Sequence, residues 1–158
     1  MFDPQSLKGR KVIIHDMTLR DGMHAKREQI GVEQMVKIAT ALDMAGVPYL
    51  QVTHGAGLGG NSEQHGRALH SNEEYLRAVV PVLKRAKASV LLIPGLGTMQ
   101  ELERAYDCGA RSVHCATHCT EADQHQRPGG GLGSKESAGH HCAKVSDCSS
   151  RIIRKENT

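Results

Sequence analysis

Four short apolar runs alternate along the chain with three segments of helical periodicity, and this alternation constrains the fold more than any other feature. The runs lie at residues 11–17, 49–53, 89–93 and 112–117. Each intervening segment is long enough for a helix and repeats apolar residues three and four positions apart. A chain that alternates strand and helix in this way forms a parallel sheet with right-handed crossovers. The sequence therefore predicts an α/β fold with four parallel strands.

Local signals mark where the predicted helices begin and end. Gly46 ends the first helix, whose apolar positions are Val32, Met35, Val36, Ala39 and Leu42. The second and third helices each begin with a capping box, formed by Ser71 with Glu74 and by Thr98 with Glu101. Pro81 removes a hydrogen bond inside the second helix, so we expect a kink there before the helix ends near Lys87.

Composition and charge exclude several classes of function. The net charge is +3, with 20 Lys and Arg interspersed among 17 Asp and Glu, so no basic stripe indicates a nucleic-acid partner. No segment reaches the roughly 20 apolar residues that span a bilayer, and the N-terminus lacks the pattern of a secretion signal. Five cysteines, an odd number, fit reduced thiols. We therefore expect a cytoplasmic protein that makes no contact with nucleic acid or membrane.

The densest chemistry in the chain follows the first apolar run. Arg20, Asp21 and His24 place a guanidinium, a carboxylate and an imidazole within five positions. A strand that ends here delivers these side chains to one rim of the sheet, where loops on a rigid scaffold carry catalytic groups. The alternative interpretation is a polar turn in which Asp21 caps a helix and Arg20 is solvated.

The segment His15–Ala25 closely resembles the first strand and loop of the 4-hydroxy-2-oxovalerate aldolases, which belong to the HMG-CoA lyase-like group of metal-dependent lyases on a TIM barrel. The likeness covers roughly residues 8–123, and its further motifs lie at residues 45–48, 52–55, 57–60, 94–95 and 116–123. It implies a parallel (β/α) barrel. Because a complete barrel needs about 250 residues, we expect an incomplete one of about four βα units over residues 1–123.

The resemblance also implies an activity and a role for each residue. These aldolases cleave 4-hydroxy-2-oxoacids to pyruvate and an aldehyde such as acetaldehyde, late in the catabolism of aromatic compounds, with a divalent metal that is usually Mn²⁺. Asp21 is then a metal ligand at the substrate, Arg20 binds substrate and stabilises the enolate, and His24 is the general base. The implied partner is an acylating acetaldehyde dehydrogenase that accepts the aldehyde.

Residues 124–158 depart from this pattern. They show no apolar period, so we expect an irregular or disordered tail, produced either by a frameshift or as a natural flexible terminus. The family completes its metal site with two histidines spaced i, i+2, and none of the ten histidines here has that spacing. The chain alone is accordingly expected to be weakly active or inactive.

Two other functions compete with the lyase. One is a non-catalytic half barrel that needs a partner chain, because its first and fourth strands would leave open edges. The other is a small metal-binding module whose candidate ligands are Cys115, Cys119, Cys142, Cys148 and nearby histidines. Residues 55–60 match the dinucleotide pattern G-x-G-x-x-G, but no predicted helix begins at Gly60, so we expect a loop over the barrel mouth. His54 either lines the barrel mouth or is a structural histidine, whereas His15 and Asp16 either support site residues from behind or serve in packing.

Overall fold

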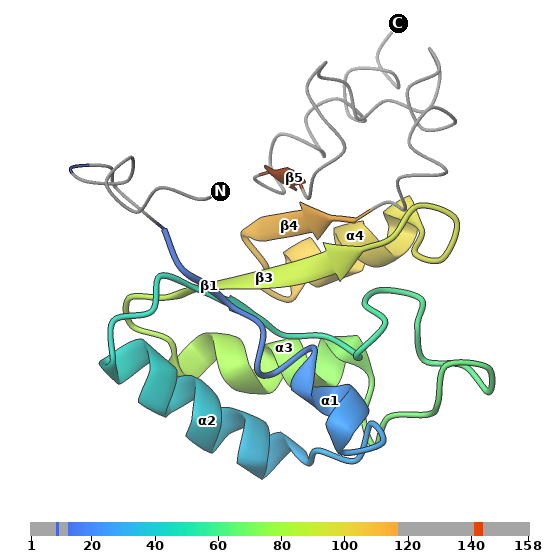
Figure 1. The fold of residues 1–158 in the computed structure, drawn as a ribbon, viewed down its shortest axis with the longest axis horizontal. Helices are drawn as coiled ribbons and strands as arrows, with labels where there is room; N and C mark the ends of the chain where they lie inside the picture. Colours follow the sequence, from blue (N-terminus) through green and yellow to red (C-terminus); the bar gives the residue numbers. More distant parts are fainter. Residues whose placement is uncertain (1–8, 10–12, 117–140, 144–158) are drawn as a thin grey trace, which may run out of the picture.

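The computed structural model describes residue 9, residues 13–116 and residues 141–143 (Figure 1). The elements are β1 (His15–Asp16), α1 (Gly22–Ala25), α2 (Val32–Met44), β2 (Tyr49–Gln51), α3 (Asn72–Val79), a 3₁₀ turn (Val80–Val82), β3 (Lys87–Leu92), α4 (Met99–Asp107), β4 (Ser112–Cys115) and β5 (His141–Ala143). None of the described helices is both long enough and apolar enough to cross a membrane.

The first four strands form a parallel sheet in sequence order, β1-β2-β3-β4. Helices α1, α2 and α3 lie together on one side of it, and α4 lies beside β3 and β4 (Figure 1). This arrangement confirms the predicted α/β fold with parallel strands, and it is the geometry of successive βα units of a barrel.

The two faces of the sheet differ in chemistry because strand side chains alternate. The face toward the helices carries the apolar core, which includes Leu50, Val52, Ala88, Val90, Leu92 and Val113. On the other face Gln51 aligns with Ser89, and Ser89 aligns with Ser112. All three of these polar residues are buried. The face that would line a barrel interior therefore carries a row of buried polar side chains beside Leu91, and site residues can extend from this face.

The capping boxes predicted for the second and third helices are present. The Ser71 hydroxyl accepts from the Glu74 N–H, while the Glu74 carboxylate accepts from the Ser71 N–H at 2.7 Å. Thr98 and Glu101 repeat the arrangement at α4. The Ser71 N–H also lowers the pKa of Glu74.

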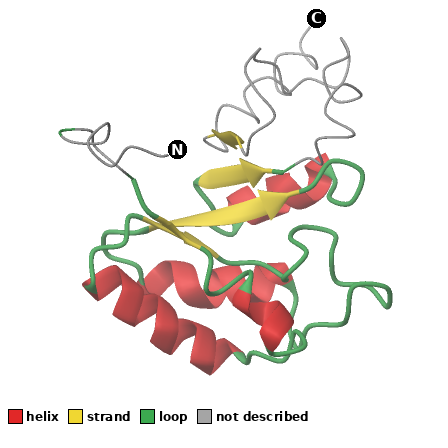
Figure 2. Cartoon of the chain, viewed as in Figure 1, coloured by secondary structure: helices red, strands yellow, loops and turns green. Residues whose placement is uncertain are grey.

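Two helical details differ from the prediction. Instead of a kinked helix that runs to Lys87, α3 ends at Val79 and a 3₁₀ turn follows, because Pro81 cannot donate the next helical hydrogen bond. The short helix α1 was not predicted, since four residues are too few to show a period. The long segment between β2 and α3 is loop, drawn in green in Figure 2.

The expected irregular tail contains one ordered pairing. Residues His141–Ala143 form β5, which lies antiparallel to β4 with His114 opposite Cys142. The expectation of an open edge at the fourth strand was therefore wrong, because β5 occupies that edge. The remaining tail residues, 124–140 and 144–158, lie outside the described part of the chain.

Candidate active site

A tight turn after β1 positions the first two predicted site residues. The carbonyl oxygen of Met17 accepts from the N–H groups of both Arg20 and Asp21, at 3.0 and 2.7 Å. Leu19 and Met23 are buried on either side of this pair and anchor the turn in the core. The turn is therefore held by two buried apolar side chains, Leu19 and Met23, on either side of the polar pair.

The Arg20 guanidinium is held by three neighbours. Its Nε donates to Oε1 of Gln51 at 2.9 Å, and its Nη2 lies 3.1 Å from the sulfur of Met17. Its Nη1 forms an ion pair of 2.8 Å with Oδ1 of Asp21. The Arg20 side chain is 13% exposed and that of Asp21 is 68% exposed. The Arg20 guanidinium is therefore held in place and mostly buried, while the Asp21 carboxylate is exposed to solvent.

The alternative interpretation of Asp21 as a helix cap is wrong. Asp21 occupies the N-cap position of α1, but its side chain makes no capping hydrogen bond. Its carboxylate instead pairs with Arg20. Arg20 is likewise not a solvated side chain.

Gln51 extends the site across the sheet. Its amide nitrogen lies 2.8 Å from Nδ1 of His114 on β4, while its amide oxygen accepts from Arg20. Arg20 has no acceptor to offer, so the oxygen of Gln51 must face it and the NH₂ group must face His114. Neither Gln51 as a site residue nor its contact with His114 was predicted from the sequence. A glutamine between Leu50 and Val52 in a predicted strand was the available signal.

His24 lies on α1, and its N–H donates to the carbonyl of Asp21 at 3.2 Å. The loop thus brings the backbones of Arg20, Asp21 and His24 into one turn. The His24 ring is 51% exposed, and its Nδ1 lies 3.0 Å from Oε1 of the buried Glu28. Sequence reasoning also missed Glu28, which shows no signal among the charged residues around it.

The other residues near the mouth have structural roles. His54 is buried, its Nε2 donates to the carbonyl of Gly66 at 2.9 Å and its Nδ1 accepts from the N–H of Ala56. His15 stacks on Tyr49 with ring centroids 4.3 Å apart, and burial lowers the pKa of His15. Asp16 accepts from the N–H of Thr18 at 2.9 Å.

The segment that contains these site residues matches a known protein family. Residues 11–129 match the HMGL-like family. The chain belongs to the HMGL-like family. Proteins of this family are TIM barrels, and the described sheet corresponds to four consecutive strands of such a barrel, with helices after the first three.

Three curated relatives of this HMGL-like chain share the name 4-hydroxy-2-oxovalerate aldolase. The chain is 77% identical over 123 residues to 4-hydroxy-2-oxovalerate aldolase 3 of Azotobacter vinelandii, which covers 78% of this chain and 35% of the relative. It is 80% identical over 118 residues to 4-hydroxy-2-oxovalerate aldolase 1 of Azoarcus sp., covering 75% and 34%. It is 61% identical over 118 residues to 4-hydroxy-2-oxovalerate aldolase of Pseudomonas putida, covering 75% and 34%. The resemblance read from the sequence is confirmed, and the chain spans about a third of the length of these relatives.

The described residues of this HMGL-like chain do not complete a metal site. Among residues 13–116, no group of three His, Cys, Asp or Glu side chains is arranged to hold an ion. Asp21 offers a surface carboxylate of which one oxygen already pairs with Arg20. A divalent metal would need further ligands in addition to Asp21.

Among the candidate ligands of the alternative zinc module, Cys115 and its neighbour His114 lie on β4 and Cys142 lies on β5. Cys119 and Cys148 lie outside the described residues. Residues 55–60 are part of a loop that continues to Ser71, and no helix begins at Gly60. The dinucleotide pattern in this HMGL-like chain therefore lacks the helix that would bind a pyrophosphate.

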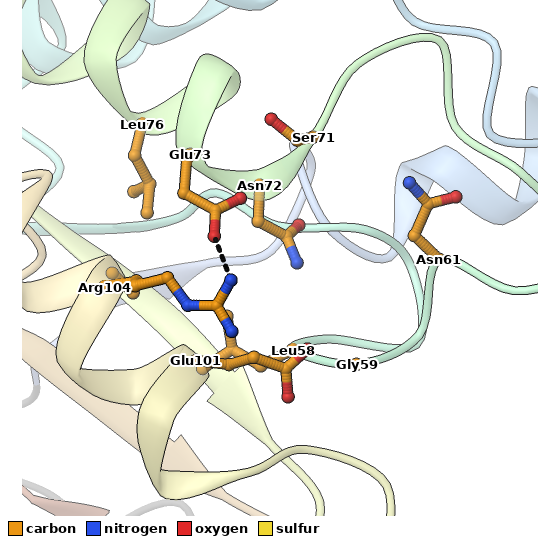
Figure 3. Close-up of a pocket in the computed structure, with 10 residues that line it drawn as sticks. Leu58, Gly59, Asn61, Ser71, Asn72, Glu73, Leu76, Glu101 and Arg104 are labelled. Atoms are coloured by element: carbon orange, nitrogen blue, oxygen red, sulfur yellow. Dashed lines mark ion pairs between the residues drawn. The ribbon is translucent and has the colours of Figure 1, made fainter.

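A cavity of about 180 Å³ lies between residues 58–61 and the first turns of α3 and α4 (Figure 3). Arg104 reaches across it toward Glu73, with a charged-group separation of 3.9 Å. Arg20, Asp21 and His24 are not among its lining residues. The cavity therefore belongs to the outer helical layer, separate from the candidate active site.

Proposed function

We propose that this chain supplies the N-terminal part of a 4-hydroxy-2-oxovalerate aldolase, a carbon-carbon lyase that cleaves 4-hydroxy-2-oxoacids to pyruvate and acetaldehyde. One observation carries the proposal: the guanidinium of Arg20 is fixed by Gln51 and Asp21, one turn before a half-exposed imidazole. The names of the relatives, at 61 to 80% identity over this segment, support the same reaction.

In the proposed reaction a base removes the proton of the substrate's 4-hydroxyl group. The C3–C4 bond then breaks, the aldehyde leaves, and the electron pair of that bond forms a pyruvate enolate, which is later protonated at C3. The step needs a base close to the hydroxyl and a fixed positive charge close to the enolate oxygen.

Arg20 meets the second need. A guanidinium presents its N–H groups in a rigid planar fork that suits carboxylate and enolate oxygens. Because Gln51 and Asp21 already hold this fork in place, little side-chain freedom is lost when a substrate binds. We assign substrate binding and enolate stabilisation to Arg20.

His24 meets the first need, as the general base. Its ring is half exposed, and no described residue forms a hydrogen bond or ion pair with its Nε2. A neutral imidazole nitrogen in this state can accept the hydroxyl proton.

We propose that the Asp21 carboxylate is one ligand of the divalent metal, for which Mn²⁺ is the proposed ion. Asp21 would contact the substrate through this metal. Carboxylate oxygens are suitable ligands for Mn²⁺, which when bound supplies a Lewis acid for the substrate carbonyl. We further propose that the protein acts in the cytoplasm, in the catabolism of aromatic compounds, with an acylating acetaldehyde dehydrogenase as partner. The proposed domain division is a barrel domain over residues 1–123 and a separate tail over residues 124–158.

A chimeric enzyme tests the proposal. Residues 1–123 of this chain replace the corresponding segment of the Azotobacter vinelandii relative, and pyruvate release is measured with 4-hydroxy-2-oxovalerate and Mn²⁺. The chimera should be active, and Arg20→Ala and His24→Asn should each lower kcat by roughly 10²-fold or more. The unaltered chain of 158 residues is assayed in parallel. In a separate measurement, the change Asp21→Asn in the chimera should weaken its binding of Mn²⁺.

A matched control is Arg67→Ala, which removes an exposed arginine whose side chain pairs, among the described residues, with the exposed Glu63. This variant should retain the chimera's activity. A chimera that folds and binds Mn²⁺ but is unaffected by Arg20→Ala would show that Arg20 has no part in the reaction.

A further inference from the structure

Glu28 is a buried carboxylate that the proposed reaction does not use. It is 3% exposed, although its neighbours Arg27 and Gln29 are exposed. Glutamate is rarely buried without partners, because removing its charge from water is costly. The contacts of Glu28 therefore need an explanation.

The two carboxylate oxygens have different surroundings. Oε2 accepts from the backbone N–H of Gly55 at 2.9 Å. It also lies 3.5 Å from Nε2 of His54, but that nitrogen already donates to the carbonyl of Gly66. Oε2 is thus satisfied by a backbone group that cannot change its proton.

Oε1 has a single neighbour able to donate. It lies 3.0 Å from Nδ1 of His24, which is a hydrogen-bond distance, although the N–H direction is poorly aligned. No other described residue donates to Oε1. Hydrogen bonds of catalytic groups are often poorly aligned without substrate and become shorter and straighter when it binds.

The backbone around Glu28 is shaped to allow this contact. Arg27 and Glu28 both have left-handed conformations, with φ of 51° and 62°, which are uncommon for residues other than glycine. A Cβ atom on Gly55 would lie 2.5 Å from Oε1 of Glu28 and 2.7 Å from Nδ1 of His24. Only a glycine at position 55 leaves room for the pair, and strained backbone of this kind is concentrated at functional sites.

We propose that Glu28 is a positioning residue for His24. Its Oε1 accepts the proton on Nδ1 and so fixes the imidazole as the Nδ1–H tautomer, which leaves the lone pair of Nε2 to take the substrate's hydroxyl proton. This inference rests on the proposed role of His24 as the base, but its structural part, the tautomer, can be measured without substrate or metal.

The test is ¹⁵N nuclear magnetic resonance of the full chain of 158 residues at alkaline pH, the range in which imidazole side chains in general are neutral. The ring signals of His24 are identified by their loss in His24→Asn. The unaltered chain should show a protonated Nδ1 and an unprotonated Nε2. The opposite pattern would overturn the proposal, and this arm needs no variant at position 28 to fold.

Glu28→Gln provides the second arm. The Gly55 N–H holds the amide oxygen of the new side chain, so its NH₂ group must face Nδ1 of His24. An NH₂ group donates, hence the His24 tautomer should reverse, with the proton moving to Nε2. The matched control is Glu63→Gln, which changes an exposed glutamate paired with Arg67 and should leave the His24 signals unchanged.

Activity separates this proposal from the proposed function. In the chimera, Glu28→Gln should lower kcat by roughly 10²-fold while KM stays within about twofold, because the base is lost and binding is retained. An unchanged tautomer in folded Glu28→Gln would overturn the positioning role. A reversed tautomer together with unchanged kcat would support the positioning role and refute His24 as the base.

Discussion

Nε of Arg20 donates a 2.9 Å hydrogen bond to Oε1 of Gln51, which ties the loop after β1 to the end of β2. The other end of the Gln51 amide reaches His114 on β4. The neutral side chain of Gln51, on β2, thus connects the loop after β1 with β4. It also holds the cation that the proposed reaction depends on, although it contributes no charge itself.

Replacing Gln51 by alanine should both destabilise the fold and loosen the site. The change leaves the part-buried Nε of Arg20 without its acceptor and removes the amide from Nδ1 of His114, at a cost of about 2 kcal/mol. Urea denaturation followed by circular dichroism measures the loss. Gln64→Ala, at an exposed loop position, should change the unfolding free energy by less than about 0.5 kcal/mol.

Asp43 should carry an acid-sensitive part of the stability. It is buried at the end of α2, and its carboxylate accepts from the N–H groups of Ala86, Arg85 and Lys84, at 2.6, 2.9 and 3.1 Å. The N–H of Ala86, with those of Arg85 and Lys84, holds the pKa of Asp43 below its usual range even though burial acts in the opposite direction. Asp43→Ala should cost about 3 kcal/mol at neutral pH, because three backbone donors lose their acceptor.

The pH dependence follows from the sign of that shift. A carboxyl whose pKa is lower in the folded state contributes stability above its unfolded pKa, about 3.9, and loses it as the pH falls through the folded value. The unfolding free energy of the unaltered chain should therefore fall more steeply below about pH 4 than that of Asp43→Asn. Asp107→Asn, at an exposed position on α4, serves as control. Parallel acid limbs for the unaltered chain and Asp43→Asn would contradict the assignment.

Tyr75 joins α3 to the chain before α2. Its hydroxyl donates to the carbonyl of Ile30 at 2.7 Å, and its ring is fully buried. Tyr75→Phe should lower stability by about 1 kcal/mol, because the carbonyl loses its donor while the packing is retained. Tyr106→Phe should have a smaller effect in the same thermal unfolding assay, since Tyr106 is only half-buried.

Burial raises the pKa of the Tyr75 phenol. A group whose folded pKa is raised stabilises the fold below its unfolded value, about 10, and this contribution disappears as the pH rises through the folded value. Alkaline titration of tyrosinate absorbance should show one of the three tyrosines ionising later than the others, and Tyr75→Phe should remove that late phase.

The helix caps provide a test of additivity. Ser71→Ala should destabilise the chain by about 1 kcal/mol, and Thr98→Ala should do the same, because each removes the acceptor for a backbone N–H at a helix N-terminus. The two changes sit on different helices, so the double variant should lose about the sum of the two. Chemical denaturation of the three variants measures this, and a double loss well below the sum would indicate that α3 and α4 are coupled.

Local features of the sequence predicted the elements that depend on local physics. The apolar runs became β2, β3 and β4, and the capping boxes at Ser71 and Thr98 set the starts of α3 and α4. Helix α1 and strand β5 could not be predicted, because a four-residue helix has no period and β5 exists only through its pairing with β4. Strand β1 (His15–Asp16) is also shorter than the apolar run at residues 11–17 indicated.

The candidate site shows the same division. Arg20, Asp21 and His24 were visible because they are close together in sequence. Gln51 is 31 positions from Arg20, and His114 is 63 positions from Gln51, so only strand register brings these side chains together. Glu28 was hidden because its burial depends on two left-handed residues that no local pattern announces.

The antiparallel pairing of residues 141–143 with β4 bears on any attempt to rebuild a complete enzyme from pieces. In a closed barrel the next strand along would run parallel to β4, with its own register. Here Val113, His114 and Cys115 already face Ala143, Cys142 and His141. A polypeptide that supplied the later strands of a relative's barrel would have to displace this short segment first. Reconstitution would then be a strand-exchange reaction, and a variant of this chain that ends before residue 141 should undergo it faster.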